Sequence, residues 1–327
     1  MLTLEMLVVK MLMSNDTKFN FVQYINASTI NRFEDKKSVI FGQNIVAGSR
    51  ISGLGAGLDQ QKNIITRNSP NVENSLMGFG LGLMLTGTDS ALIMKQHDFA
   101  LLGLDQLTNT VNVAKTYSLS ASFIVMMVVV DSGFEGPQAS LNNLDEFASL
   151  SRSPVHFLNT RENIDRAFKS SKTPGLHMMA LSQKSMKLAL VSYEDIGENV
   201  GIGELIRNSS QSSTLLIYFG LDLNYLNEIN SEFNSHKVAT DHLIVSGISS
   251  NMKIDEPLIS HYKSIVVIDT SKSEISYAQM FSHKITSRGR KVTYVGREPS
   301  IKWSYVNGDQ PEITPKTVYE LWKGNSH

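Results

Sequence analysis

The sequence predicts an α/β protein made of two successive units, each built on a mostly parallel sheet. Short apolar segments typical of buried strands alternate with segments whose apolar residues recur at helical spacing, and this order favours parallel strands joined by helices. The segment SFIVMMVVVD at residues 122–131 is almost continuously apolar, which is typical of a strand buried on both faces of its sheet. A chain of 327 residues is long enough for two domains and a substantial core.

The first unit opens with a predicted helix over residues 20–33, where Phe21, Ile25 and Phe33 are among the apolar residues at helical spacing. A glycine-containing loop at residues 52–59 follows the first predicted strand. The same patterns predict further helices over residues 71–87, 101–117 and 161–171, and strands over residues 38–45, 90–96, 122–131, 155–159 and 177–182.

A polar segment containing glycine and serine, residues 191–213, is typical of a linker between two domains. Beyond it the pattern predicts strands over residues 214–220, 242–248, 264–271 and 291–298, and helices over residues 222–233 and 276–287. We therefore expect an N-terminal extension at residues 1–17, a first domain at residues 18–200 and a smaller second domain at residues 201–327.

The charge balance bears on the kind of partner to expect. The chain has 30 basic and 31 acidic residues and a net charge of −1, which argues against nucleic acid or an anionic membrane as the main partner. It has no cysteine, which excludes disulfides, thiolate metal sites and thiol nucleophiles. The apolar start lacks the features of a secretory signal, and no segment reaches the roughly 20 apolar residues of a membrane span. We therefore expect a cytoplasmic protein.

Catalytic motifs of the common hydrolases and metalloenzymes are not found in the sequence. The histidines lack the HExxH spacing of a zinc site, and no serine lies in a GxSxG motif. The glycines of GFGLGL, residues 78–83, are not followed by the Lys-Ser/Thr pair of a phosphate-binding loop. Glycine inside a helix costs about 1 kcal/mol relative to alanine, so these glycines indicate that a neighbour packs closely against the helix.

Glu73 is the one acidic residue at the start of this glycine-rich, apolar helix. Acidic residues favour the first helical turn because they interact with the helix dipole, and this alone could explain its position. Alternatively, a carboxylate in dry surroundings has a raised affinity for protons, which suits acid–base chemistry.

The segment ENSLMGFGLGLMLTGTDSALIMKQHDFALLGLDQLTNTVNVAKTY, residues 73–117, resembles the pyrimidine-binding domain of the beta subunits of thiamine-diphosphate-dependent 2-oxoacid dehydrogenases. VVVDSGFEGPQAS and LDEFASL continue the resemblance, and the second unit is similar to a transketolase-type C-terminal domain. The resemblance covers residues 18–303. The residues of the first segment that match the family pattern, in order, are Glu73, Gly78, Gly82, Gly87, Asp98, Phe99, Asp105 and Gln106.

The resemblance implies a cofactor and a role for three residues. In that family the glutamate, here Glu73, binds a ring nitrogen of the aminopyrimidine of thiamine diphosphate, and proton sharing there promotes loss of the thiazolium proton. Phe99 would stack on the aminopyrimidine, although an aromatic residue after a strand is also commonly part of the core. Lys95 replaces a residue that is usually neutral near the pyrimidine. Asp98 could instead cap the helix that follows it, and we assign no chemistry to Asp105 or Gln106.

Two departures from the family pattern limit what the resemblance implies. The family usually has a histidine after its GPQ-like loop, whereas this chain has Ala139 and Ser140; His97 and His156 are the histidines that we consider as replacements. The GDG motif that holds the diphosphate and Mg²⁺ is also missing. The resemblance therefore implies an alpha-type partner that supplies this half of the site, in an alpha2beta2 assembly.

Three functions remain open. The first is a beta-type subunit that decarboxylates a 2-oxoacid, with a lipoyl acyltransferase core as a further partner. The second is a carboligase or transketolase-like synthase subunit, which the missing histidine favours because its reaction does not transfer an acyl group to a lipoyl arm. The third is a non-catalytic structural or regulatory subunit, in which the changes at Lys95 and at Ala139 and Ser140 would reflect lost function.

Overall fold

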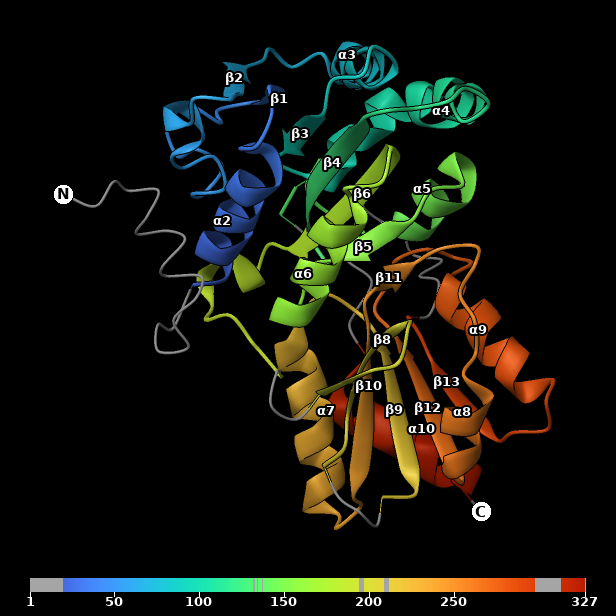
Figure 1. Cartoon of the computed structure of the whole chain (residues 1–327). Helices are drawn as coiled ribbons and strands as arrows, with labels where there is room; N and C mark the ends of the chain where they lie inside the picture. The colour runs from blue at the N-terminus through green and yellow to red at the C-terminus, as the bar shows by residue number, and fades with distance from the viewer. Residues whose placement is uncertain are drawn as a thin grey trace.

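The computed structural model describes residues 20–131, 133, 135–136, 138–193, 197–208, 212–297 and 313–326. The predicted extension at residues 1–17 lies outside this part of the chain. The described residues form two sheets, and Figure 1 shows one above the other, with the amino-terminal half of the chain in the upper sheet. The predicted α/β class with mostly parallel sheets is confirmed. The predicted division at residue 200 stays a prediction.

The first sheet has seven strands in the order β11-β5-β6-β4-β3-β1-β2. Only β11, which comes from the later part of the chain, runs antiparallel, beside β5. The strands are β1 (Ser38–Gly42), β2 (Ile64–Asn68), β3 (Ser90–Met94), β4 (Ser122–Val129), β5 (Val155–Phe157), β6 (Gly175–Ser182) and β11 (Gly247–Ile248).

Helices cover both faces of the first sheet. Residues of α2 (Phe21–Phe33) and α6 (Arg161–Ser170) pack on one face. On the other face lie α3 (Glu73–Leu85), α5 (Leu144–Ser151) and a helical segment after β3. That segment consists of a 3-10 turn η2 (His97–Gly103), a π-helical turn η3 (Gln106–Thr110) and α4 (Val111–Ala114), so the helix predicted over residues 101–117 begins earlier and is irregular.

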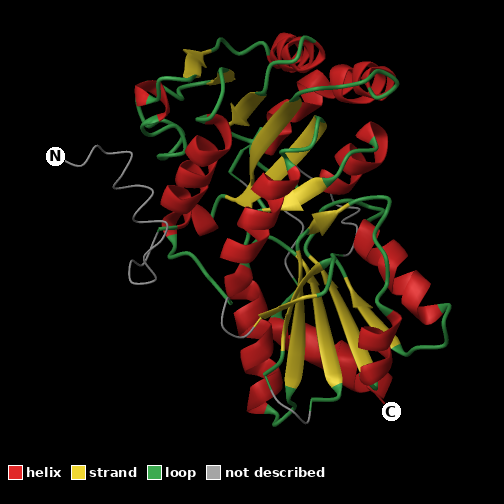
Figure 2. Cartoon of the chain, viewed as in Figure 1, coloured by secondary structure: helices red, strands yellow, loops and turns green. Residues whose placement is uncertain are grey.

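The second sheet has six strands in the order β13-β12-β9-β10-β8-β7. Its strands are β7 (Gly197–Asn199), β8 (Gly203–Ile206), β9 (Thr214–Phe219), β10 (Thr240–Val245), β12 (Ser264–Asp269) and β13 (Val292–Val295). Figure 2 shows these strands and their flanking helices, α7 (Leu223–Ser235), α8 (Glu256–His261), α9 (Tyr277–Thr286) and α10 (Pro315–Ser326). Short 3-10 turns are also present, η1 (Leu58–Gln60) and η4 (Ser185–Lys187).

Strand β4 is the centre of the core. Its side chains alternate between two faces, with Phe123 and Val125 in the cluster beneath α3 and α5, and Ile124 and Met126 in the cluster beneath α2 and α6. Every residue of β4 is buried, as the continuous apolar run predicts. The cluster beneath α3 and α5 continues into the second sheet, so the two sheets share one core.

Gly80 sets how closely α3 approaches the first sheet. A Cβ atom on Gly80 would lie 2.2 Å from the ring of Phe123, so only glycine allows this separation of helix and strand. At Gly82, by contrast, a Cβ atom would meet no other atom within 4 Å. The close neighbour predicted from the glycines is therefore, at Gly80, a strand of the same chain, whereas the side of α3 at Gly82 remains open.

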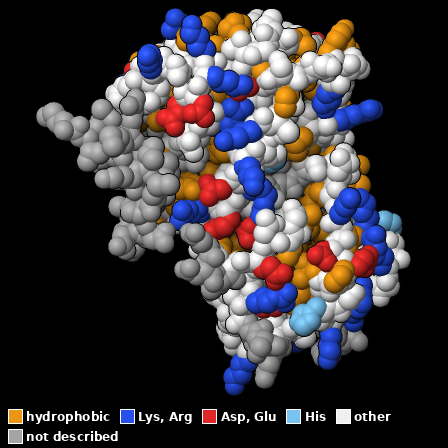
Figure 3. Space-filling view, viewed as in Figure 1, with side chains coloured by type: hydrophobic (Ala, Val, Ile, Leu, Met, Phe, Trp, Pro, Cys, Tyr) orange, Lys and Arg blue, Asp and Glu red, His pale blue; other side chains and the backbone are white. Residues whose placement is uncertain are grey.

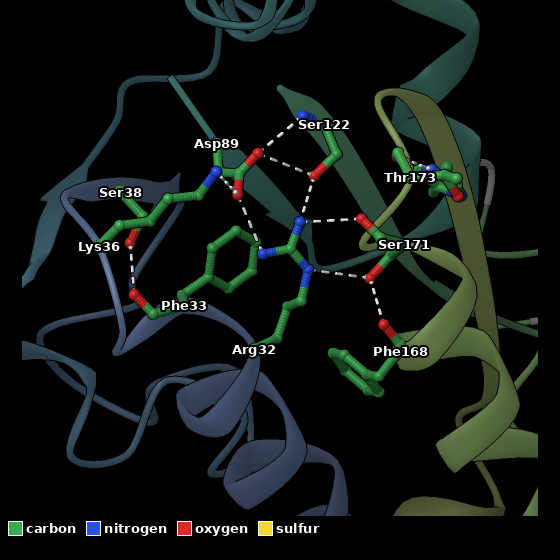
Figure 4. Close-up of polar contacts among 10 residues, drawn as sticks. Arg32, Phe33, Lys36, Ser38, Asp89, Ser122, Phe168, Ser171 and Thr173 are labelled. Carbon is green, nitrogen blue, oxygen red and sulfur yellow. Dashed lines mark hydrogen bonds and ion pairs between the residues drawn. The ribbon is translucent and has the colours of Figure 1, made fainter. Parts of the chain in front are cut away.

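A buried ion-pair cluster lies at the amino ends of β3 and β4 (Figure 4). Arg32, at the end of α2, donates to the Asp89 carboxylate at 3.0 Å and to the Ser122 hydroxyl at 2.6 Å. Arg32 also donates to the Ser171 carbonyl oxygen at 2.8 Å, and Lys36 pairs with Asp89 at 2.9 Å. This cluster holds α2 and the C-terminal end of α6 against the sheet at the amino ends of its strands, opposite to their carboxyl ends.

Candidate functional site

Polar side chains gather where β1, β3 and β4 end. Strand β1 has β2 on one side and β3 on the other, so the chain changes direction across the sheet between β1 and β3. In open α/β sheets ligands bind outside the carboxyl ends of the strands at such a switch point. Gln43 follows β1, the segment from Lys95 to Phe99 follows β3, and Glu73 begins α3 after β2.

Glu73 lies in the first turn of α3 and its residue surface is only 5% exposed. Gln43 donates a hydrogen bond from Nε2 to Glu73 Oε1 at 2.8 Å. An acidic side chain in the first helical turn interacts favourably with the helix dipole, and the Gln43 amide fixes one of the Glu73 oxygens. Sequence reasoning missed Gln43, although a polar residue directly after the strand SVIFG was a signal that could have pointed to it.

Phe99 and Lys95 come from the segment after β3. Phe99 is half-buried and packs against the main core cluster. It therefore belongs in part to the core, and the accessible part of its ring leaves the predicted stacking role open. Lys95 is exposed. The structure therefore brings Lys95 and Phe99 to the same carboxyl ends of the strands as Glu73. The Phe99 side chain remains partly accessible there.

Asp98 does not cap the helical turn that follows it. The cap position is Gln96, which makes no side-chain cap hydrogen bond. The Asp98 carboxylate instead accepts hydrogen bonds from the backbone N–H groups of Ser140 and Leu141, at 3.1 and 3.3 Å. Ala139 and Ser140 are both buried, so the loop after β4 reaches the site through its backbone at the position where the resembled family has a histidine.

Of the two histidines considered as replacements for the missing one, His97 lies in the core and His156 is half-buried on β5. The His97 ring is fully buried, with Nδ1 3.4 Å from Met127 Sδ, and burial lowers its pKa to about 4. The His156 ring stacks on His177 with centroids 6.0 Å apart. Burial, with a smaller effect from His177, lowers the pKa of His156 to about 4. Both imidazoles are neutral at pH 7, and the suggestion that either replaces the family histidine finds no support in their positions.

Asp131 is a buried carboxylate at the end of β4 that sequence reasoning did not select. Burial raises its pKa to about 6, and the Asp222 carboxylate acts in the same direction. The Ser182 hydroxyl donates to Asp131 Oδ1 at 2.7 Å and partly opposes this shift. The acidic residue that ends SFIVMMVVVD was the available signal.

A pair of carboxylates, Asp145 and Asp269, lies at the junction of the two sheets. Asp145 of α5 accepts hydrogen bonds from the Tyr277 N–H at 2.7 Å and the Ser271 hydroxyl at 2.8 Å. Burial, together with the neighbouring Asp269 carboxylate at the end of β12, raises the pKa of Asp145 to about 7. Burial also raises the pKa of Asp269. Ionisation of both groups therefore works against the contact between the sheets.

The described residues fit one half of a thiamine diphosphate site. A buried carboxylate and a partly accessible aromatic ring suit the ring nitrogen and the face of an aminopyrimidine. In the part of the chain that the structure describes, no group of three or more acidic or histidine side chains is placed to hold a metal ion. None of the helices in this part of the chain is both long and apolar enough to cross a membrane.

Comparisons with known proteins identify the fold. No protein-family model matches the chain, and no curated protein is significantly similar in sequence. Among solved structures, a split gene transketolase in an inactive beta4 tetramer aligns with a TM-score of 0.65. The alignment covers 94% of this chain and 96% of the transketolase chain at 13% identity. The chain has a transketolase-like fold. At this identity the similarity shows the fold, and the roles of Glu73, Phe99 and Lys95 do not follow from it.

Proposed function

We propose that this chain is the beta-type subunit of a thiamine-diphosphate-dependent enzyme that acts on a 2-oxoacid or a related ketone donor. The observation that carries the proposal is the buried Glu73 carboxylate, fixed by Gln43 at 2.8 Å at the switch point of a transketolase-like sheet. When bound, the cofactor supplies the electron sink for cleavage beside a carbonyl group. Glu73 would hold the shared proton at the aminopyrimidine ring nitrogen, and Phe99 would stack on the ring.

An alpha-type partner completes the site on this proposal. The sequence lacks the GDG motif that holds the diphosphate and Mg²⁺ in the resembled family. Exposed apolar side chains on α3 and on the helical segment beside it form a surface that a partner would cover; these are Phe79, Leu85, Leu101, Leu102 and Val113. The similar transketolase beta chain is inactive as a beta4 tetramer, which supports a requirement for a second kind of chain.

Decarboxylation and carbon–carbon bond formation remain two candidate reactions. The loop after β4 presents no acid–base side chain at Ala139 or Ser140, and both residues are buried. Loss of a general acid–base group typically costs about 10²–10⁴-fold in rate. This observation favours the synthase over a reaction that transfers an acyl group to a lipoyl acyltransferase core. Detection of a carbon–carbon bonded product with an acceptor aldehyde would distinguish the synthase from the decarboxylating subunit.

The test measures cofactor activation without knowledge of the substrate. The chain is purified together with its alpha-type partner, loaded with thiamine diphosphate and Mg²⁺, and assayed for hydrogen exchange at the thiazolium carbon. We expect fast exchange in the wild type and a loss of about 10²-fold or more in Glu73→Gln, because the amide cannot share the proton. Glu228→Gln, at an exposed position of α7, is the matched control and should exchange like the wild type.

Two results would contradict the proposal. Equal exchange in the wild type and in Glu73→Gln would remove Glu73 from cofactor activation. Cofactor binding without exchange in the wild type would instead identify a non-catalytic subunit, in which substitution of Glu73 leaves the activity of the assembly unchanged.

A further inference from the structure

The peptide group between Ser140 and Leu141 is held at both ends by charged side chains. Its N–H, which belongs to Leu141, donates to the Asp98 carboxylate at 3.3 Å. Its carbonyl oxygen, which belongs to Ser140, accepts from Lys272 Nζ at 2.6 Å. The preceding N–H of Ser140 also donates to Asp98, at 3.1 Å.

The two charged residues come from different sheets. Asp98 lies in η2 after β3, whereas Lys272 lies in the loop after β12. Lys272 makes two further contacts with the segment after β4, since its Nζ donates to the Gly133 carbonyl at 2.9 Å and its N–H donates to the Asn142 carbonyl at 2.9 Å. The Lys272 side chain therefore contacts two points, Gly133 and Ser140, of the segment that follows β4.

Charge fixes the direction of this peptide group. If the group turned over, its carbonyl dipole would point at the Asp98 carboxylate and its N–H at the Lys272 ammonium, so both interactions would become repulsive. Hydrogen bonds to ionised groups are about twice as strong as those between neutral groups, and Ser140 is buried, where such contacts are screened less than in water.

We propose that Lys272 is a positioning residue, which acts through the Ser140–Leu141 peptide group to hold the loop after β4 in place beside the candidate site. Because Asp98 is the neighbour of Phe99 in the chain, the same hydrogen bonds connect the second sheet to the segment that carries Phe99. That this loop lies beside a cofactor site rests on the proposed function, whereas the positioning of the loop by Lys272 does not.

Hydrogen–deuterium exchange of the full chain tests the positioning directly. In Lys272→Met, which keeps most of the length of the side chain and removes the ammonium group, we expect backbone N–H groups of residues 138–142 to exchange about tenfold faster or more. Lys263→Met, at an exposed lysine that precedes β12, is the matched control and should exchange like the wild type. Lys272→Arg keeps the charge and the donors and should restore most of the protection.

A second variant approaches the same peptide group from the other side. Asp98→Asn keeps the shape and removes the charge, and it should also increase exchange in residues 138–142, so the test holds even if Lys272→Met does not fold. Unchanged exchange of residues 138–142 in the variants that fold would overturn the inference. Exchange that rises equally in α5, α9 and the loop would also overturn it, because Lys272 would then only hold the sheets together.

A separate measurement distinguishes this inference from the proposed function. In the assembled complex with thiamine diphosphate and Mg²⁺, Lys272→Met should retain exchange at the thiazolium carbon, because Glu73 and Gln43 keep their hydrogen bond. Loss of that exchange in Lys272→Met would contradict a role confined to the loop. Absence of exchange in the wild type would count against the proposed function alone and would leave the loop measurement valid.

Discussion

Gly80 offers a quantitative test of how α3 is placed against the sheet. In Gly80→Ala the new Cβ atom would lie 2.2 Å from two atoms of the Phe123 ring, far inside the roughly 3.5–4.0 Å of an ordinary carbon–carbon contact. The ring cannot move away easily, because Phe123 is fully buried and stacks on Phe41 with centroids 6.3 Å apart. The helix itself must therefore shift.

The expected cost follows from two opposing effects. Overpacking a core costs about 1–3 kcal/mol, and the depth of this overlap places Gly80→Ala near about 3 kcal/mol on that scale. Alanine in place of glycine favours the helix by about 1 kcal/mol, so the free energy of unfolding should fall by about 2 kcal/mol. Gly82→Ala gains the same helical preference without a clash, and it should raise the free energy of unfolding by about 1 kcal/mol.

Urea unfolding of the chain alone, followed by far-ultraviolet circular dichroism, measures both variants. We expect transition midpoints on opposite sides of the wild-type value, with a difference of about 3 kcal/mol between the variants. Equal stabilisation by both substitutions would refute the reasoning, because Phe123 would then not limit the approach of α3. A less stable Gly82→Ala would show that the side of α3 at Gly82 is covered within the chain.

Four further predictions concern assembly, activation and pH. Gly82→Leu should leave the chain folded but weaken its association with an alpha-type partner, measured by analytical ultracentrifugation; unchanged association would exclude this side of α3 as an interface. Gln43→Leu should slow thiazolium exchange about tenfold, since a hydrogen bond to a charged group is worth about 1.5–3 kcal/mol; wild-type exchange would exclude Gln43 from fixing the carboxylate. Burial alone would raise the pKa of Asp89, but hydrogen bonds from the Ser122 N–H, Lys36 and Arg32 lower it. The ionised Asp89 carboxylate therefore stabilises the fold above its ordinary pKa, and this effect is lost as the pH falls through its lowered pKa in the folded state. In urea titrations, Asp89→Asn should lower the free energy of unfolding by about 3 kcal/mol at pH 7 and by less at pH 3. Because the pKa of Asp145 is raised to about 7, stability should fall as pH rises from about 4 to 7. Asp145→Asn should flatten that slope, and an unchanged slope would contradict the raised pKa of Asp145, which burial and then Asp269 cause.

The elements that the sequence predicted correctly are those whose hydrophobic pattern reflects their own burial. Strand β4 is apolar throughout because both of its faces are covered, and the pattern of α2 reflects one covered face. Strand β2, with only its first residue buried, and α10, whose inner residues meet α7, have no comparable signal. Their positions depend on neighbours that are distant in the sequence.

The candidate site was predictable only in part, for a related reason. Glu73 and Phe99 were found through a resemblance that follows the order of residues along the chain. Gln43 was missed because its contact with Glu73 joins the residue after β1 to the first turn of α3, thirty residues later. For Asp98 the sequence suggested a helix cap, whereas its backbone partners lie about forty residues away. Long-range polar contacts of this kind have no periodic signature in a sequence.

The distribution of polar groups explains why this chain should need a partner. A pyrimidine requires one carboxylate and one aromatic face, which the ends of a single sheet can provide. A diphosphate with Mg²⁺ requires oxygen ligands and neutralising charge, and the sequence lacks the GDG motif that supplies them in the resembled family. The exposed apolar side chains near Gly82, such as Phe79 with 51% of its surface exposed, lie on the helix that begins with Glu73. A partner bound there would therefore contact the same helix that carries the proposed activating carboxylate. Gly82→Leu should weaken both assembly and cofactor activation, whereas Glu73→Gln should lose only cofactor activation.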